Sequence, residues 1–162
     1  MDILPTDIKK NHNKNLSPRE LSRLLSIICL YTLKYRGQNK VDVMKAVIQD
    51  RLWQIELQEV KLPNLDELFL ITLIDGVLEN QEKLNNIIAQ HITSKKILLD
   101  KLDLLILTIL QCGCFEITHS DLKINVILYQ YTFLTDCFFS KNEIAMVNAI
   151  LHAIAKSFRK EP

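Results

Sequence analysis

The sequence predicts an all-α protein. Only three glycines and four prolines interrupt its 162 residues, whereas β-rich folds need frequent turn residues. The hydrophobic share of 48% is enough to build one sizeable core. We therefore expect one helical domain over residues 17–160. Residues 1–16 are polar and rich in asparagine and lysine, and we expect them to be loosely ordered.

The first helix has clear start and stop signals. Residues 16–21 read Leu-Ser-Pro-Arg-Glu-Leu. Ser17 suits the N-cap, Pro18 suits the first helical position, and Glu20 completes a capping box. Apolar residues then recur at helical spacing until Gly37, which we expect to end the helix.

Six more helices are expected after the first one. Their ranges are residues 41–57, about 65–77, 82–92, about 98–117, 122–137, and a last helix from the capping box 140–143 to about 158. The range 98–117 is apolar nearly all round, which indicates the buried centre of the fold. Gly76 lies inside a helical pattern, where a close contact between helices is favoured over a turn.

The sequence also indicates a cellular compartment. No run of about 18 apolar residues is present to cross a bilayer. Four charged residues among the first ten leave no room for the apolar part of a signal peptide. We expect a cytoplasmic protein with reduced thiols in apolar helical surroundings. The cysteines are Cys29, Cys112, Cys114 and Cys137.

Catalysis and metal binding find little support in the sequence. Cys112 and Cys114 could begin a zinc site, but helical residues two apart point in different directions. No second pair of ligands at suitable spacing completes the site, so packing is favoured. The glycines are isolated, which excludes a dinucleotide or phosphate loop. No base partner for a cysteine nucleophile is identifiable. We expect no cofactor, no metal and no enzymatic activity.

Positive charge is concentrated near the N-terminus. The net charge is +1, yet residues 9–40 carry eight basic residues against Glu20 alone. Arg19 and Arg23 lie one turn apart at the start of the first helix, where the helix dipole also favours phosphate. The segment suggests an anionic partner, although a solvated helix face remains the alternative.

A second candidate site lies where the sixth and seventh expected helices meet. Phe138 and Phe139 precede a helix that begins with Lys141 and Asn142. An exposed ring there could stack on an unpaired base while the polar groups read its edges. The alternative is packing, since at least one of two adjacent phenylalanines is expected in the core.

Several segments resemble the NusB family of transcription antitermination factors. Residues 109–117, ILQCGCFEI, resemble the family pattern I-L-R-x-G/A-x-Y-E-L, and residues 120–122 its acidic turn. Residues 126–131, VILYQY, correspond to its V-I-S/N-E-x helix, and residues 146–151, MVNAIL, to F-V-N-G/A-V-L. The N-terminal arginines and residues 29–31, CLY, resemble its arginine-rich opening helix. The Phe-Phe pair is most similar to alphaproteobacterial members.

The resemblance implies a fold of two packed helical bundles and a function in antitermination. The family holds boxA single-stranded RNA jointly with the ribosomal protein NusE, so that RNA polymerase reads through terminators in ribosomal RNA operons. It implies RNA contacts for Arg19, Arg23, Phe138 and Asn142, beside which we place Lys141. It also implies that NusE meets Tyr31 and Tyr35. A homodimer stays open, because family members differ in oligomeric state.

Some residues depart from the family pattern, and other functions were weighed. The departures are Glu20 and Leu21 for arginines, Gln111 for the signature arginine, Gln130 for glutamate and Met146 for an aromatic residue. One alternative is an accessory helical domain of a ribosomal RNA methyltransferase system. The other is a protein-interaction scaffold that has lost RNA binding.

Overall fold

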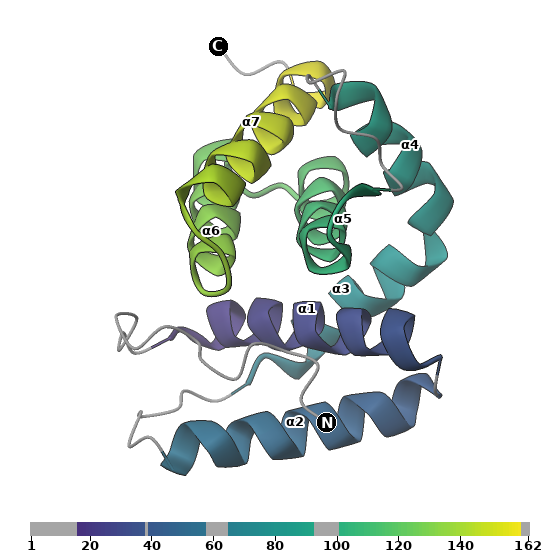
Figure 1. Cartoon of the computed structure of the whole chain (residues 1–162), viewed down its shortest axis with the longest axis vertical. Coiled ribbons are helices and arrows are strands. Elements are labelled where there is room, and N and C mark those ends of the chain that lie inside the picture. Colours follow the sequence, from purple (N-terminus) through teal and green to yellow (C-terminus); the bar gives the residue numbers. More distant parts are fainter. Residues whose placement is uncertain (1–15, 38, 58–64, 93–100, 160–162) are drawn as a thin grey trace. The chain divides into compact units, whose positions relative to one another are not determined.

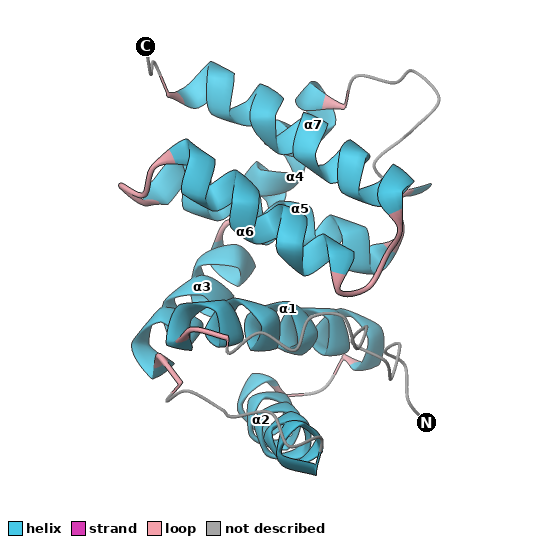
Figure 2. Cartoon of the chain, turned by 90° about the vertical axis from the view of Figure 1, so that its left-hand side faces the viewer, coloured by secondary structure: helices cyan, strands magenta, loops and turns pink. Residues whose placement is uncertain are grey.

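A computed structural model describes residues 16–37, 39–57, 65–92 and 101–159. These residues form seven helices and no strand, which confirms the all-α prediction (Figures 1 and 2). The helices are α1 (Pro18–Arg36), α2 (Lys40–Leu57), α3 (Glu67–Glu79), α4 (Gln81–His91), α5 (Leu104–His119), α6 (Ile124–Asp136) and α7 (Lys141–Phe158). The segment expected to be loosely ordered lies, apart from Leu16, outside the described residues.

The chain divides into two compact units. The first spans Met1–Ile74 and contains α1, α2 and most of α3. The second spans Asp75–Pro162 and contains the end of α3 with α4 to α7. In the first unit α1 contacts α2, and in the second α5 contacts α4, α6 and α7.

The ends of α1 follow the predicted signals. The Ser17 hydroxyl accepts the N–H of Glu20 at 3.1 Å, and the Glu20 carboxylate accepts the N–H of Ser17 at 3.4 Å. This capping box satisfies N–H groups that have no partner within the helix. At the other end Gly37 has φ 62°, a left-handed conformation that glycine adopts without a steric penalty.

Helix α5 is the centre of the second unit, as the sequence predicts. Figure 1 shows α4 on one side of α5, with α6 and α7 on other sides. Eleven of its residues are buried: Leu105, Ile106, Thr108, Ile109, Leu110, Gln111, Cys112, Gly113, Cys114, Glu116 and Ile117. It begins at Leu104 rather than at the expected residue 98, because Asp103 caps it. The Asp103 carboxylate accepts the N–H of Leu105 at 2.8 Å and that of Ile106 at 3.3 Å.

Gly76 permits a close contact between α3 and α5. A Cβ atom at Gly76 would lie 2.1 Å from Cζ of Phe115. No side chain fits at that distance, so the ring of Phe115 occupies the space that a larger residue would need. The expectation that Gly76 serves a helix contact instead of a turn is confirmed.

Arg159, which follows α7, binds the segment between α5 and α6. Its Nε donates to the carbonyl of Ile117 at 2.9 Å, and Nη2 donates to that of Ser120 at 2.5 Å and that of Glu116 at 3.3 Å. Nη1 donates to the carbonyl of Leu122. These bonds supply donors to carbonyl groups at and just after the C-terminal end of α5, where the helix leaves carbonyls without intrahelical partners. The carbonyl of Glu116 also accepts the N–H of Ser120 at 3.0 Å.

All four cysteines are buried free thiols. Burial raises the pKa of Cys29 and Cys114 to about 12, because the low-dielectric core disfavours the thiolate. Within the described ranges, no group of three His, Cys, Asp or Glu side chains could hold a metal ion. None of the helices in those ranges is both long and apolar enough to span a membrane.

Candidate functional site

Arg19 and Arg23 of α1 share one aromatic neighbour in the first unit. The guanidinium carbon of Arg19 lies 5.0 Å from the centroid of the Phe69 ring, and that of Arg23 lies 4.9 Å from it. Both distances are within the range of a cation–π interaction. Because the residues are one helical turn apart, they face the same side of α1, as their spacing predicts.

Asp66, just before the start of α3, contacts Arg19, Phe69 and Ser22. One carboxylate oxygen lies 3.5 Å from Nε of Arg19, and the other accepts the N–H of Phe69 at 3.1 Å. The N–H of Asp66 donates to the hydroxyl of Ser22 at 3.1 Å, and that hydroxyl donates to the carbonyl of Pro18 at 2.8 Å. The N-termini of α1 and α3 are thus joined by side chains as well as by packing.

Solvent reaches the two arginines to different extents. The side chain of Arg19 is 53% exposed, whereas Arg23 is 3% exposed. A phosphate could approach the guanidinium of Arg19 in this conformation, but the guanidinium of Arg23 is buried. Contact of either residue with RNA stays a prediction.

Sequence reasoning did not identify Phe69 and Asp66 as members of this group. Phe69 continues an apolar helical pattern and is indistinguishable there from a core residue. Asp66 falls within the helix expected at about residues 65–77, but α3 begins at Glu67, and the Asp66 carboxylate accepts an N–H of its first turn. The spacing of the cap and the ring, Asp-x-x-Phe, is the signal that could have indicated them.

Tyr31 and Tyr35 lie one turn apart further along α1. Their ring centroids are 6.3 Å apart and their planes make an angle of 25°. Tyr35 is 54% exposed and Tyr31 is partly exposed. The pair offers an aromatic surface with hydroxyl groups, which suits a protein contact. Its role toward NusE stays a prediction.

The Phe138–Phe139 junction connects α6 to α7 in the second unit, and Figure 2 shows it as a short loop. The N–H groups of Phe138 and Phe139 donate to the carbonyl of Thr135 at 3.0 and 2.9 Å. Both rings are partly exposed, so the expectation that one of them lies in the core is wrong.

The first turn of α7 continues this junction with exposed polar residues. Lys141 and Asn142 are both exposed. Glu143 accepts the N–H of Ser140 at 3.3 Å and its hydroxyl at 2.9 Å, which fixes the start of the helix. The structure thus brings Phe138, Lys141 and Asn142 to one place in the second unit, while the arginines lie in the first. Their RNA contacts stay predictions.

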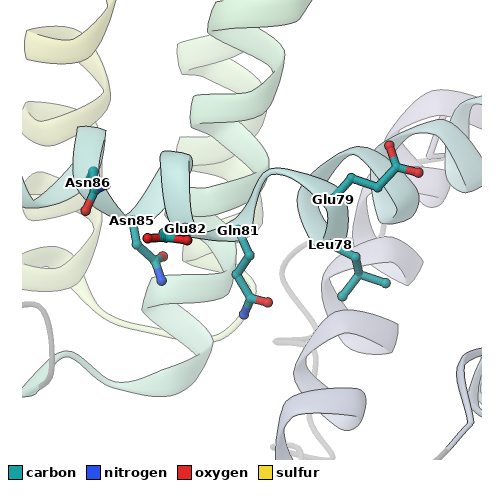
Figure 3. A pocket seen from close by; sticks show the side chains of 6 residues that line it. All are labelled: Leu78, Glu79, Gln81, Glu82, Asn85 and Asn86. Atoms are coloured by element: carbon teal, nitrogen blue, oxygen red, sulfur yellow. The ribbon is translucent and has the colours of Figure 1, made fainter.

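A shallow depression at the end of α3 and along α4 has a different character. Figure 3 shows the side chains that line it: Leu78, Glu79, Gln81, Glu82, Asn85 and Asn86. Two carboxylates make it a poor site for a nucleic acid, because they repel phosphate. Asn85 also has a structural role here, since its side-chain oxygen accepts a hydrogen bond at 2.6 Å from Nε2 of the buried Gln111.

Comparisons with known proteins identify the family. The model of the NusB family matches residues 20–156. The chain belongs to the NusB family. This match confirms the resemblance drawn from the opening helix, the residues around Gly113 and the helix α7.

Curated relatives match nearly the whole chain. The transcription antitermination protein NusB of Nitrobacter hamburgensis is 28% identical over 154 residues, which cover 94% of this chain and 95% of the relative. That of Rhizobium johnstonii is 30% identical over 150 residues and covers 92% of each chain.

A solved structure of the NusB family supports the fold. It is a crystal structure of the antitermination factors NusB and NusE in complex with double-stranded RNA. The matched chain is 22% identical to this one, with a TM-score of 0.68 over 86% of this chain and 97% of that chain. At this identity the similarity concerns the helical fold.

Proposed function

We propose that this chain is a transcription antitermination protein that binds boxA-type single-stranded RNA together with NusE. The observation that carries the proposal is the match of the family model to residues 20–156. Relatives that are antitermination proteins also align with more than 90% of the chain. A role on nascent RNA places the protein in the cytoplasm, beside RNA polymerase, and requires no catalysis by the protein itself.

Arg19 of α1, whose side chain is exposed, would contact the RNA backbone. Arg19 presents a guanidinium at the N-terminal end of a helix, where the dipole adds a positive potential. Such a contact adds affinity without reading sequence, because every nucleotide carries the same phosphate.

The α6–α7 junction would contact bases. Phe138 is partly exposed and lies beside Lys141 and Asn142, so one ring can stack on a base while an amide bonds to its edge and an ammonium group meets phosphate. Tyr31 and Tyr35 of α1 would contact NusE. The antitermination role of the curated relatives favours this function over an accessory domain of a methyltransferase system.

The experiment is a binding titration of a fluorescent boxA-like single strand with the chain, with and without purified NusE. We expect NusE to strengthen binding, and we expect a scrambled strand and a boxA duplex to bind more weakly. Affinity should fall with salt, because phosphate contacts release counterions. Binding to NusE without any RNA binding would indicate the scaffold function instead. Binding to neither would contradict the proposal.

A further inference from the structure

One aromatic ring lies against two positive charges in the first unit. Both guanidinium carbons are about equally far from the centroid of Phe69, at 5.0 Å for Arg19 and 4.9 Å for Arg23. Two guanidinium groups close together repel each other, and the negative face of an aromatic ring is a neutral group that attracts both. Phe69 therefore attracts both guanidinium groups, of which that of Arg19 stays exposed and that of Arg23 is buried.

The ring is held in place from two directions. Its own N–H is bonded to the carboxylate of Asp66, whose N–H is bonded to Ser22 on α1. Ser22 lies between the two arginines in the sequence of α1. The position of the ring relative to the arginines thus depends on hydrogen bonds between the two helix starts as well as on apolar packing.

Arginine has a long side chain that loses much rotamer freedom when it is fixed on a ligand. Stacking on a ring removes part of that freedom before the ligand arrives. Asp66 occupies only the Nε side of Arg19, at 3.5 Å, and the side chain remains 53% exposed. The contacts of the free chain thus restrain this guanidinium while leaving it accessible to a phosphate.

We propose that Phe69 is a positioning residue for RNA binding, whose ring face orders Arg19 and Arg23 before RNA arrives. The inference rests on the proposed function, and it adds a residue that does not itself touch RNA. Arg23, which is buried, contributes by packing against the same ring. Arg19 supplies the phosphate contact.

The test compares four variants of the full chain in RNA titrations over a range of salt concentrations. Phe69→Leu keeps an apolar side chain but removes the π face, and Phe69→Tyr keeps the π face. Leu70→Val shortens the buried neighbour of Phe69 on α3 and serves as a stability control. Arg19→Ala removes the phosphate contact itself. NMR spectra of the arginine Nε–H groups without RNA report directly on the ring current of residue 69.

We expect Phe69→Leu to weaken RNA binding about 3- to 10-fold. Without the ring, the arginine side chains must be ordered when RNA binds, and this ordering lowers the affinity. The slope of log affinity against log salt should stay unchanged, because the phosphate contact still forms in the complex. Arg19→Ala should instead flatten that slope by about 0.7. Phe69→Tyr and Leu70→Val should bind as the parent does. The arginine resonances should move in Phe69→Leu and stay in place in Phe69→Tyr.

Two results would contradict the positioning role of Phe69 without contradicting the proposal that the chain binds RNA. One is full affinity in Phe69→Leu when Arg19→Ala is impaired. The other is equal weakening in Phe69→Leu, Phe69→Tyr and Leu70→Val, which would assign the effect to stability. If the parent chain itself binds no boxA-like RNA, the proposed function fails, and this inference fails with it.

Discussion

Gln111 occupies a buried position of the central helix α5 and bonds to a residue of α4. In the family pattern an arginine occupies this position of the central helix. Here the amide is fully buried and donates to Asn85 of α4 at 2.6 Å. A buried arginine needs a charged partner to offset its desolvation, whereas an amide needs only a hydrogen-bond acceptor. In this chain two neutral amides make the contact between α4 and α5 at this position.

The two rings at the α6–α7 junction allow a test at the residue scale. If Phe138 stacks on a base, Phe138→Ala should cost about 1–3 kcal/mol of RNA affinity. Binding to NusE should change little, because Tyr31 and Tyr35 are intact. RNA titration and a NusE pull-down measure the two effects.

Phe139→Ala is the matched control at this junction, since both rings are partly exposed. If Phe138 alone stacks on a base, Phe139→Ala should leave the RNA affinity close to that of the parent chain. The opposite result, with Phe139→Ala selectively impaired in RNA binding, would show that the two rings have exchanged roles.

Asn142→Asp should weaken RNA binding most at low salt, where repulsion of phosphate is least screened.

Single residues were predicted less fully than helices. The i, i+4 spacing placed Arg19 and Arg23 on one side of α1, but it could not reveal that one is exposed and the other buried. Phe69 comes from a distant part of the sequence, and only the packing of α3 beside α1 makes it a neighbour. Exposure and tertiary contacts depend on the whole fold, which local periodicity does not encode.

At the scale of elements, local signals located most helix ends. Ser17, Gly37 and Ser140 each lie at the predicted end, because capping depends on residues next to one another in sequence. The start of α5 was placed too early. Its apolar pattern continues upstream, and the Asp103 carboxylate, which binds two N–H groups, ends that continuity.

The central position of α5 gives a prediction about an element. Leu110 is fully buried in the second unit. Leu110→Ala should lower the free energy of unfolding by about 2–5 kcal/mol, through lost burial and the remaining cavity. Chemical denaturation followed by circular dichroism measures the change. Leu68, which is 78% exposed, provides the control: Leu68→Ala should cost far less. Similar losses in both variants would mean that α5 is not the core of its unit.

At the scale of the whole molecule, the buried thiols make the free energy of unfolding depend on pH. Cys29 has an ordinary pKa of 9.0 when unfolded and about 12 when folded. Above pH 9 the unfolded chain releases a proton that the folded chain retains, so ionisation favours unfolding as the pH rises. The stabilisation present below pH 9 is thus lost progressively between pH 9 and 12.

Comparison of the parent chain with Cys29→Ala isolates this effect from the titration of lysines and tyrosines. Between pH 8.5 and 10.5, the parent should lose about 1–2 kcal/mol more of unfolding free energy than the variant. Urea titrations at both pH values measure the difference. An equal loss in both proteins would mean that Cys29 ionises as readily in the folded chain as in the unfolded one.

The fold class and family were predictable from the whole sequence, since they depend on helical periodicity and on several motifs in order. Composition pointed to a single helical domain, and the family resemblance implied two helical bundles. The contacts divide the chain into two compact units at Ile74 and Asp75. Helix α3 runs through this division without a break. Asp75 and Gly76 lie directly after this division, but both residues are helical, so this pair of turn-forming residues does not mark a turn here.

Arg159 affects the order in which the chain can fold on the ribosome. Its guanidinium binds four carbonyl groups between Glu116 and Leu122, about forty positions earlier in the sequence. Synthesis proceeds from the N-terminus, so α5 and α6 emerge long before this partner exists. Until then the carbonyls of Ile117, Ser120 and Leu122 lack the donors that Arg159 supplies, whereas the carbonyl of Glu116 also accepts the N–H of Ser120. The hydrogen bonds between α1 and α3 in the first unit need no residue beyond 74, so the first unit can form earlier. We expect the second unit to complete its folding only after α7 has emerged.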